Sequence, residues 1–397
     1  MKKSTITSFI KQKNQTMNKS TCDDKPRTGE AGAGRLQSLD ALRGFDMFWI
    51  IGWGGIWHAL AKLTDWPLFN WWSVQMEHVD WHGFAFYDLI FPLFLFIAGI
   101  SFPFSLAKSY QKGITTKRLY VRIFKRALLL VLLGMVFNGL LKFDFATMRY
   151  ASVLGRIGLA WMFAALIFIN AKRTGRIVWC MALLVFYWVL MALFQAPDYP
   201  GAELFSKEGN FASYIDRMFL PGRMYEPLYD PLGLLGIIPA ISNALLGMFA
   251  GELVMSRKEG LNGTKKTVYL LVAGVVLILV ALLWDQIFPI NKKLWTSSFV
   301  CLTAGIGSLL FGLFYWLIDV RGYRRWPFFF TVIGVNSITI YMAQAIINFG
   351  FTSNYLFGGL FGLFPEPWTD FLNAVAFIAV CWLFLYFLYK QKIFIKV

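Results

Sequence analysis

Long uninterrupted runs of apolar residues, separated by short polar segments, are the dominant pattern along the chain. Each run has about 20 residues, the length that a helix needs to cross about 30 Å of hydrocarbon. Strands of a membrane barrel would instead alternate polar and apolar positions over about ten residues. The pattern therefore predicts an all-α polytopic membrane protein with about ten transmembrane helices, at approximately 44–62, 88–107, 123–141, 156–171, 177–194, 232–255, 268–288, 297–318, 328–347 and 370–389.

Composition agrees with this pattern. Of the 397 residues, 57% are hydrophobic and only 15% are charged, whereas soluble domains carry about 25% charged residues. Residues 1–34 differ from the rest because they are polar and rich in Lys, Ser and Thr. They lack the apolar centre of a signal peptide, so we expect a disordered cytoplasmic tail. Residues 35–397 are expected to form one membrane domain.

The distribution of positive charge predicts the orientation. About three quarters of the 38 Lys and Arg residues fall on the side of the predicted spans that holds the N-terminus. This bias predicts that both termini are cytoplasmic. The net charge of +16 then reflects topology and contact with anionic lipid headgroups, and it does not indicate nucleic-acid binding. The four cysteines have no metal-site spacing, so neither a metal nor a disulfide framework is expected.

Two of the three histidines, His78 and His82, lie between the first two apolar runs. An imidazole at the edge of a membrane helix is a candidate for proton or acyl transfer. Asp88 opens the second run six residues after His82 and could assist that chemistry. Its alternative role is to cap the helix N-terminus.

Other polar residues fall inside or beside the predicted spans. Asn336 and Tyr341 lie on a polar helix face that could line a cavity or form interhelical hydrogen bonds. Asp40 and Arg43 are three residues apart and could pair at the inner surface. The predicted outer loops 63–87, 195–231 and 348–369 contain many aromatic residues, and 195–231 also contains many acidic ones. Such loops suit sugar or amine recognition, although an aromatic membrane belt is the alternative.

Several sequence blocks together resemble the heparan-α-glucosaminide N-acetyltransferase family. The first is RLQSLDALRGFDMFWI at 35–50, and the next combines His78, Trp81, Gly83 and Asp88 with the Leu-x-Phe-Pro that follows. The remaining blocks are LGRIGLAW at 154–161, YDPLGLLGIIPAISNALLGMFAG at 229–251, FPINKKLWTSSFV at 288–300 and WPFFFTVIGVNSITIYMAQ at 326–344.

This resemblance implies a membrane acetyltransferase that uses cytosolic acetyl-CoA as its co-substrate. The acceptor would be an amino sugar of the glucosamine type, or a glycan, on the opposite side of the membrane. It also implies that His78 is the catalytic histidine, since His82 stands where the lysosomal members carry Asn. The chain has Gly52 and Leu232 where those members carry Asn and Glu, and these departures concern the acceptor more than the donor. The short form resembles bacterial relatives, so we expect a bacterial inner membrane with the active-site loop facing the periplasm.

The predicted site has three parts. The catalytic residues are His78 and Asp88. The expected acceptor-binding residues are Trp81, His82, Asp230, Asn291, Trp295, Thr296, Asn336 and Tyr341. The residues expected to bind CoA on the basic inner face are Asp40, Arg43, Lys117, Arg118 and Arg122, although the positive-inside bias alone could explain the cations.

Two mechanisms remain open at this stage. His78 could act as general base for direct transfer, which we favour, or it could carry the acetyl group as an acyl-imidazole. Two other functions also remain: a transporter of a small polar or sugar solute, and an acyltransferase that moves a longer acyl group to a cell-surface glycan. The expected partners are the acceptor, membrane lipids and, as an option, a second copy of the chain in a homodimer.

Overall fold

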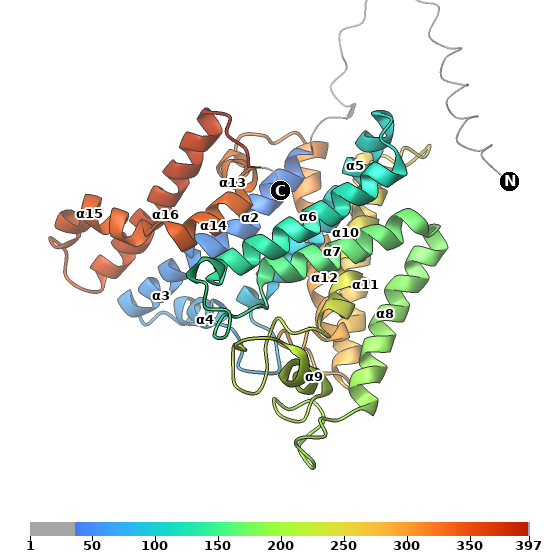
Figure 1. Cartoon of the computed structure of the whole chain (residues 1–397). Coiled ribbons are helices and arrows are strands. Elements are labelled where there is room, and N and C mark those ends of the chain that lie inside the picture. The colour runs from blue at the N-terminus through green and yellow to red at the C-terminus, as the bar shows by residue number, and fades with distance from the viewer. Residues whose placement is uncertain (1–35, 396–397) are drawn as a thin grey trace, which may run out of the picture. The chain divides into compact units, whose positions relative to one another are not determined.

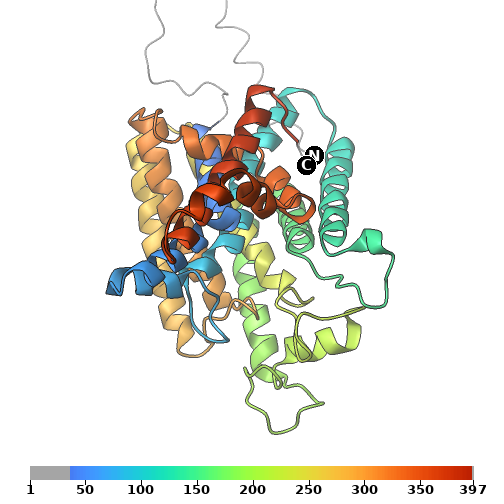
Figure 2. The same cartoon turned by 90° about the vertical axis from the view of Figure 1, so that its left-hand side faces the viewer.

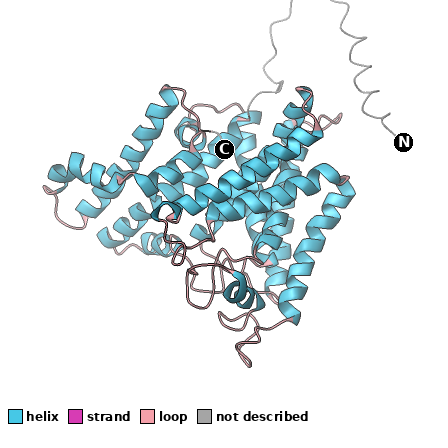
Figure 3. Cartoon of the chain, viewed as in Figure 1, coloured by secondary structure: helices cyan, strands magenta, loops and turns pink. Residues whose placement is uncertain are grey.

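The computed structural model describes residues 36–395, which form helices joined by loops (Figures 1 and 3). The predicted tail at 1–34 lies outside the described residues. The elements in chain order are α2 (Gln37–Phe48), η1 (Trp49–Trp53), α3 (Gly54–Leu63), α4 (Pro67–Gln75), η2 (Phe86–Leu89), α5 (Ile90–Gln111), α6 (Thr116–Phe137), η3 (Leu140–Lys142), α7 (Val153–Asn170), α8 (Arg173–Leu193), α9 (Phe211–Phe219), α10 (Ile237–Met255), α11 (Gly263–Asp285), α12 (Ser297–Phe314), η4 (Tyr315–Val320), α13 (Phe328–Gly334), α14 (Ser337–Ile346), α15 (Phe349–Phe361) and α16 (Trp368–Lys390).

Within residues 36–395, seven helices are long and apolar enough to cross a membrane. The count becomes eight if the bent pair α13 and α14 is one span. These findings confirm the prediction of an all-helical polytopic membrane protein. The seven helices correspond to seven of the ten apolar runs and are Phe86–Gln111, Val153–Asn170, Arg173–Leu193, Ile237–Met255, Gly263–Asp285, Ser297–Val320 and Trp368–Lys390.

Three predicted spans differ from single apolar helices, and each has a local cause. The first is interrupted by a π-helical turn in which Gly52 has φ +145°, a conformation that favours glycine. The third is helix α6, whose apolar stretch carries Arg122, Lys125 and Arg126. The ninth is broken between α13 and α14, which are bent by 66° around Asn336. The described residues therefore support seven or eight spans, where the sequence predicts about ten.

Helices α5 and α10 pack closely in the core because small residues lie where they cross. A Cβ atom added to Gly247 of α10 would lie 2.1 Å from the carbonyl oxygen of Phe96. One added to Gly99 of α5 would lie 2.2 Å from the carbonyl oxygen of Ala244. Backbones that approach this closely are typical of helix packing in membranes. The tight contact holds α5 in place, and α5 follows directly on the segment that carries Asp88.

The segments that build the site gather at one end of the helix bundle. Loop 195–231 and α9 lie at the lower end in Figure 1, whereas the turn between α5 and α6 lies at the upper end. Figure 2 gives the same arrangement from the side. The segment before α5 is joined to the segment between α11 and α12 by a hydrogen bond of 2.9 Å from Gly83 N–H to the Ile290 carbonyl.

Candidate active site

His78 lies in a non-helical loop between α4 and η2. Neither His78 nor His82 lies in a helix. Gly83 has φ +113°, a conformation that favours glycine. The amide side chain of Gln75 accepts a hydrogen bond from Phe86 N–H at 3.0 Å and so ties the two ends of the loop together. The two imidazoles consequently lie in different surroundings.

The carboxylate of Asp88 holds the His78 ring. Its Oδ1 lies 2.8 Å from His78 Nδ1, and its Oδ2 accepts the Ala85 N–H at 3.1 Å. Asp88 therefore contacts the imidazole and also satisfies a backbone donor at the helix start. The carboxylate is buried, whereas the His78 side chain is 46% exposed. Because an ionised carboxylate only accepts hydrogen bonds, Nδ1 is the donor in this contact, and a neutral imidazole oriented in this way has its lone pair on Nε2.

Lys292 completes this cluster from the loop between α11 and α12. Its Nζ lies 2.9 Å from His78 Nδ1, 3.1 Å from His78 Nε2 and 3.2 Å from Asp88 Oδ1. Burial lowers the pKa of Lys292 to about 8, although the neighbouring Asp88 carboxylate opposes the shift. The sequence reasoning missed Lys292 as a site residue, even though it lies in one of the blocks that carry the family resemblance.

The loop that carries Lys292 is fixed by its own side chains. Asn291 Oδ1 accepts the Leu294 N–H at 2.9 Å, and Thr296 Oγ1 accepts the Asn291 N–H at 3.0 Å. Trp295 has φ +57° and is fully buried, with its ring 4.6 Å from that of Phe91. Asn291 and Thr296 therefore shape the loop backbone and keep Lys292 facing His78.

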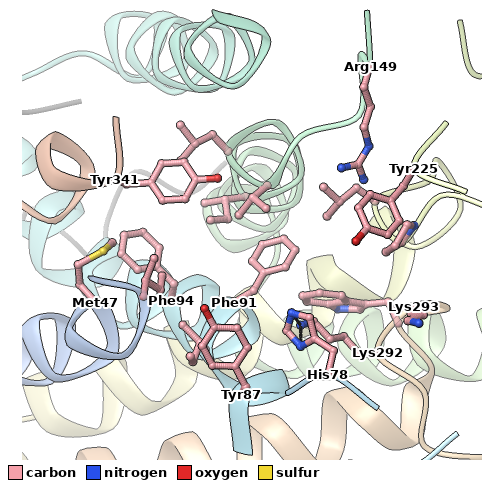
Figure 4. A pocket seen from close by; sticks show the side chains of 18 of the residues that line it. Met47, His78, Tyr87, Phe91, Phe94, Arg149, Tyr225, Lys292, Lys293 and Tyr341 are labelled. Carbon is pink, nitrogen blue, oxygen red and sulfur yellow. Dashed lines mark hydrogen bonds between the residues drawn. The ribbon is translucent and has the colours of Figure 1, made fainter. Parts of the chain in front are cut away.

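A cavity of about 330 Å³ opens beside these groups (Figure 4). In the view of Figure 4, His78, Lys292 and Lys293 lie toward one end of it, and Met47 and Tyr341 lie at the other. The full lining comprises Met47, Ile50, His78, Tyr87, Ile90, Phe91, Phe94, Arg149, Val153, Leu154, Ile157, Tyr225, Pro231, Leu232, Lys292, Lys293, Trp295, Ile338 and Tyr341. The cavity therefore has a cationic end and a mainly apolar end, which suits a ligand with a polar head and a flexible, less polar arm.

Arg149 and Asp230 form a buried ion pair at the cationic end. Arg149 Nε and Nη2 donate to the two oxygens of Asp230 at 2.8 and 2.6 Å. The same carboxylate accepts the N–H groups of Tyr225 and Leu232 at 2.9 and 2.8 Å. Asp230 is thus fully engaged with neighbouring groups, whereas Arg149 and Tyr225 line the cavity. The sequence analysis singled out Asp230 but missed Arg149, its partner 81 positions away.

The remaining residues predicted to bind the acceptor divide into two groups. Trp295 and Tyr341 line the cavity. The others do not line it: Trp81 donates from Nε1 to the Phe205 carbonyl at 2.7 Å, His82 lies 3.4 Å from the Asn291 amide nitrogen, and Asn336 donates to the Ile393 carbonyl at 3.0 Å. Burial lowers the pKa of His82.

The residues predicted to bind CoA also divide into two groups. Arg43 lies 3.6 Å from Asp40 and donates to Ser101 Oγ at 2.9 Å. Its charge also interacts with that of Arg126, whose guanidinium lies over the Trp161 ring at 4.3 Å. Lys117, Arg118 and Arg122 are exposed on α6, apart from this pair. Arg126 was not among the residues predicted to bind CoA. The sequence places it in a cluster of positive charges on the cytosolic side, but it does not show that the side chain points into the protein.

Residues 35–282 match the family described as heparan-alpha-glucosaminide N-acetyltransferase, catalytic. The heparan-alpha-glucosaminide N-acetyltransferases of Mus musculus and Homo sapiens are 25% and 26% identical, over 95% and 91% of this chain. The matches cover 63% and 60% of those relatives, so the chain spans less than two thirds of their length. Since the family match covers more than half of the sequence, the chain belongs to the heparan-alpha-glucosaminide N-acetyltransferase catalytic family.

Proposed function

We propose that this membrane protein transfers an acetyl group from acetyl-CoA to the primary amine of an amino sugar or glycan. The observation that carries the proposal is the His78 imidazole, held by the buried Asp88 carboxylate at the edge of a 330 Å³ cavity. The names of the mouse and human relatives describe the same reaction class. We place the acceptor at the His78 end and the CoA moiety at the opposite end.

The proposed chemistry is general base catalysis by His78. Asp88 accepts the Nδ1 hydrogen, so the Nε2 lone pair is available to take a proton. The acceptor amine attacks the thioester carbonyl carbon, its proton passes to Nε2, and the new C–N bond forms as the C–S bond breaks. The proton then moves from the imidazolium to the CoA sulfur. An acetyl-imidazole intermediate would use the same nitrogen and is the second route that the geometry permits.

The donor end of the site rests on Arg43 and Arg126. Two like charges that interact within the protein favour an anion between or beside them, and CoA carries phosphates. Met47 lines the cavity one helical turn from Arg43, which is about 6 Å along the helix. The pantetheine arm would then run along the apolar part of the cavity toward His78. This arrangement requires a CoA site on the cytosolic side and an acceptor site on the opposite side.

A direct assay tests this function. Purified full-length protein is incubated with acetyl-CoA and glucosamine, and both CoA thiol release and N-acetylglucosamine are measured. We expect both products in equal amounts, and we expect His78→Ala to form both at least about 100-fold more slowly. His58→Ala is the matched control, because His58 pairs with Ser73 at 2.7 Å and does not line the cavity. Thiol release beyond one equivalent per protein without an acetylated sugar, or solute uptake without thiol release, would contradict the proposal.

A further inference from the structure

Lys292 places a primary amine where the amine of the acceptor has to react. Its Nζ lies 3.1 Å from His78 Nε2, the nitrogen that takes the proton in the proposed mechanism, and 2.9 Å from His78 Nδ1, so the amine contacts both nitrogens of the ring. The side chain is only 16% exposed and lines the same cavity as His78. An acceptor amine must come within hydrogen-bond distance of the base before attack, and the Lys292 amine already lies within that distance of the ring.

The surroundings of Lys292 favour a neutral, nucleophilic amine. Burial lowers its pKa to about 8, so the amine is uncharged more often at pH 8 than that of an ordinary lysine. The charged groups that face it are Asp88, which favours the ammonium form, and Lys293, which opposes it. His78 can also receive the proton of the ammonium form directly. Most lysines on protein surfaces have a pKa of about 10.4 and stay protonated at this pH.

We propose that Lys292 is an internal acetyl acceptor, and that acetyl-CoA acetylates its Nζ when no amino sugar occupies the cavity. In this step Nζ attacks the thioester carbon, the C–N bond forms and the C–S bond breaks. The amine proton passes through His78 Nε2 to the departing CoA sulfur. The inference rests on the proposed function, because it uses the same donor and the same base.

Acetylation would change the site in two ways. The amide of acetyl-lysine is neutral, so the contact of 3.2 Å with Asp88 would no longer be an ion pair. The acetyl group would also occupy the volume beside His78 that the acceptor needs. We therefore expect modified protein to be inactive toward an amino sugar, so that acetyl-CoA supplied without acceptor inactivates the enzyme.

The neighbouring lysine provides an internal control. Lys293 lines the same cavity, but its Nζ donates to the Asp80 carbonyl oxygen and lies 5.6 Å from the centre of the Tyr229 ring. It is therefore directed away from His78. A reaction that depends only on cavity access would label both lysines, whereas a reaction that depends on the imidazole would label Lys292 alone.

The test uses full-length protein in detergent, incubated at pH 8 with acetyl-CoA that carries a deuterated acetyl group and with no acceptor. Peptide mass spectrometry measures labelling of Lys292 and Lys293. We expect labelling at Lys292, and we expect His78→Ala to reduce it by about 100-fold or more, the range of general base catalysis. Excess glucosamine should suppress it, and the protein labelled to completion should show a matching loss of activity. In Lys292→Arg the cavity should remain unlabelled, whereas Lys293→Arg should leave the label on Lys292.

The outcomes separate this inference from the proposed function. Turnover of glucosamine with no acetyl group on Lys292 would overturn the internal acceptor and leave the acetyltransferase standing. Equal labelling of Lys292 and Lys293, unchanged in His78→Ala, would show uncatalysed acetylation and would also overturn it. If the protein neither acetylates glucosamine nor labels itself, the proposed function fails and this inference fails with it.

Discussion

Asp88 Oδ1 lies 2.8 Å from His78 Nδ1, although the two residues belong to different segments, a loop and the start of a helix. The carboxylate is buried at the start of the segment leading into α5, and the imidazole is half exposed at the cavity. A buried carboxylate that orients an exposed imidazole fixes which ring nitrogen carries the hydrogen. The pair therefore gives the loop histidine a defined orientation, which a mobile side chain would lack.

We predict different effects from removing His78 and His82. His78→Ala should lower kcat by about 100-fold to 10,000-fold, because it removes the proposed general base. His82→Ala should keep kcat within about tenfold of wild type, since that ring contacts Asn291 and does not line the cavity. Steady-state kinetics of both purified variants measures the difference. A larger loss in His82→Ala than in His78→Ala would show that the roles of the two imidazoles are reversed.

Asp88→Asn should reduce kcat strongly while leaving the affinity for acetyl-CoA nearly unchanged. The amide keeps the shape of the carboxylate, but its NH₂ group can turn toward Nδ1 and favour the tautomer with hydrogen on Nε2. We expect a fall in kcat of about 100-fold or more. Isothermal titration with CoA checks that the variant is folded and binds the donor. Activity near the wild-type level would leave Asp88 with only its role in accepting the Ala85 N–H.

The membrane class was accessible from sequence for a physical reason. An apolar run of about 20 residues can be read without knowledge of its neighbours, because the bilayer fixes the required length. His78 and Asp88 occur in one sequence block, so a local pattern was enough to single out both residues, but the contact between them was not predicted. The absence of a continuous helix through His78 and His82 was also predictable, because glycine at 83 disfavours a helix.

Other parts of the site depend on long-range contacts, which the sequence does not display. Lys292 is 214 positions from His78, and from sequence alone it resembles any charged loop residue. It reaches His78 only because α11 and α12 fold so that the loop between them lies beside the histidine loop. Arg149 also resembles an ordinary loop charge in the sequence, and its ion pair with Asp230 is visible only in the structure. Hydropathy also treats the ninth apolar run as continuous, whereas the structure bends it by 66° between α13 and α14. These features arise from tertiary structure, so a residue-by-residue reading could not supply them.

We predict that Arg126→Gln raises the KM for acetyl-CoA by about tenfold and leaves kcat nearly constant. Arg126 and Arg43 interact electrostatically and are the proposed partners of the CoA phosphates, and neither lines the cavity beside His78. A charge-assisted contact with phosphate contributes about 1.5–3 kcal/mol, which agrees with a change of this size. Lys117→Gln is the control, because Lys117 is exposed on the same helix. Equal effects of the two substitutions would argue for general electrostatics and against a defined phosphate site.

We predict that the free energy of unfolding depends on pH through the Asp216 carboxyl group. It lies on α9, where burial raises its pKa from 3.8 to about 7. Between these two values the folded protein binds a proton that the unfolded chain releases, so the free energy of unfolding falls as pH rises. Asp216→Asn cannot titrate, and its amide oxygen can still accept the Leu234 N–H, which Asp216 Oδ1 accepts at 2.8 Å.

The measurement is the apparent Tm in detergent at pH 5 and pH 8. We expect the wild type to lose more stability than Asp216→Asn over this interval, so that the variant gains relative to the wild type at pH 8. Glu203→Gln is the control, because Glu203 is exposed. Parallel pH profiles for wild type and Asp216→Asn would show that the Asp216 carboxyl group does not titrate in this window.

The last prediction concerns sidedness, on which the separation of donor and acceptor depends. Glu203 lies in loop 195–231 and Lys258 follows α10; the 19 residues of α10 would separate these positions by about 28 Å. With Cys22→Ser as background, Glu203→Cys should react with an impermeant maleimide in intact cells, because the described native cysteines are buried. Lys258→Cys should react only after permeabilisation. The reverse pattern would place His78 in the cytosol beside the CoA pool, and an acceptor on the other side would then have no access to the imidazole.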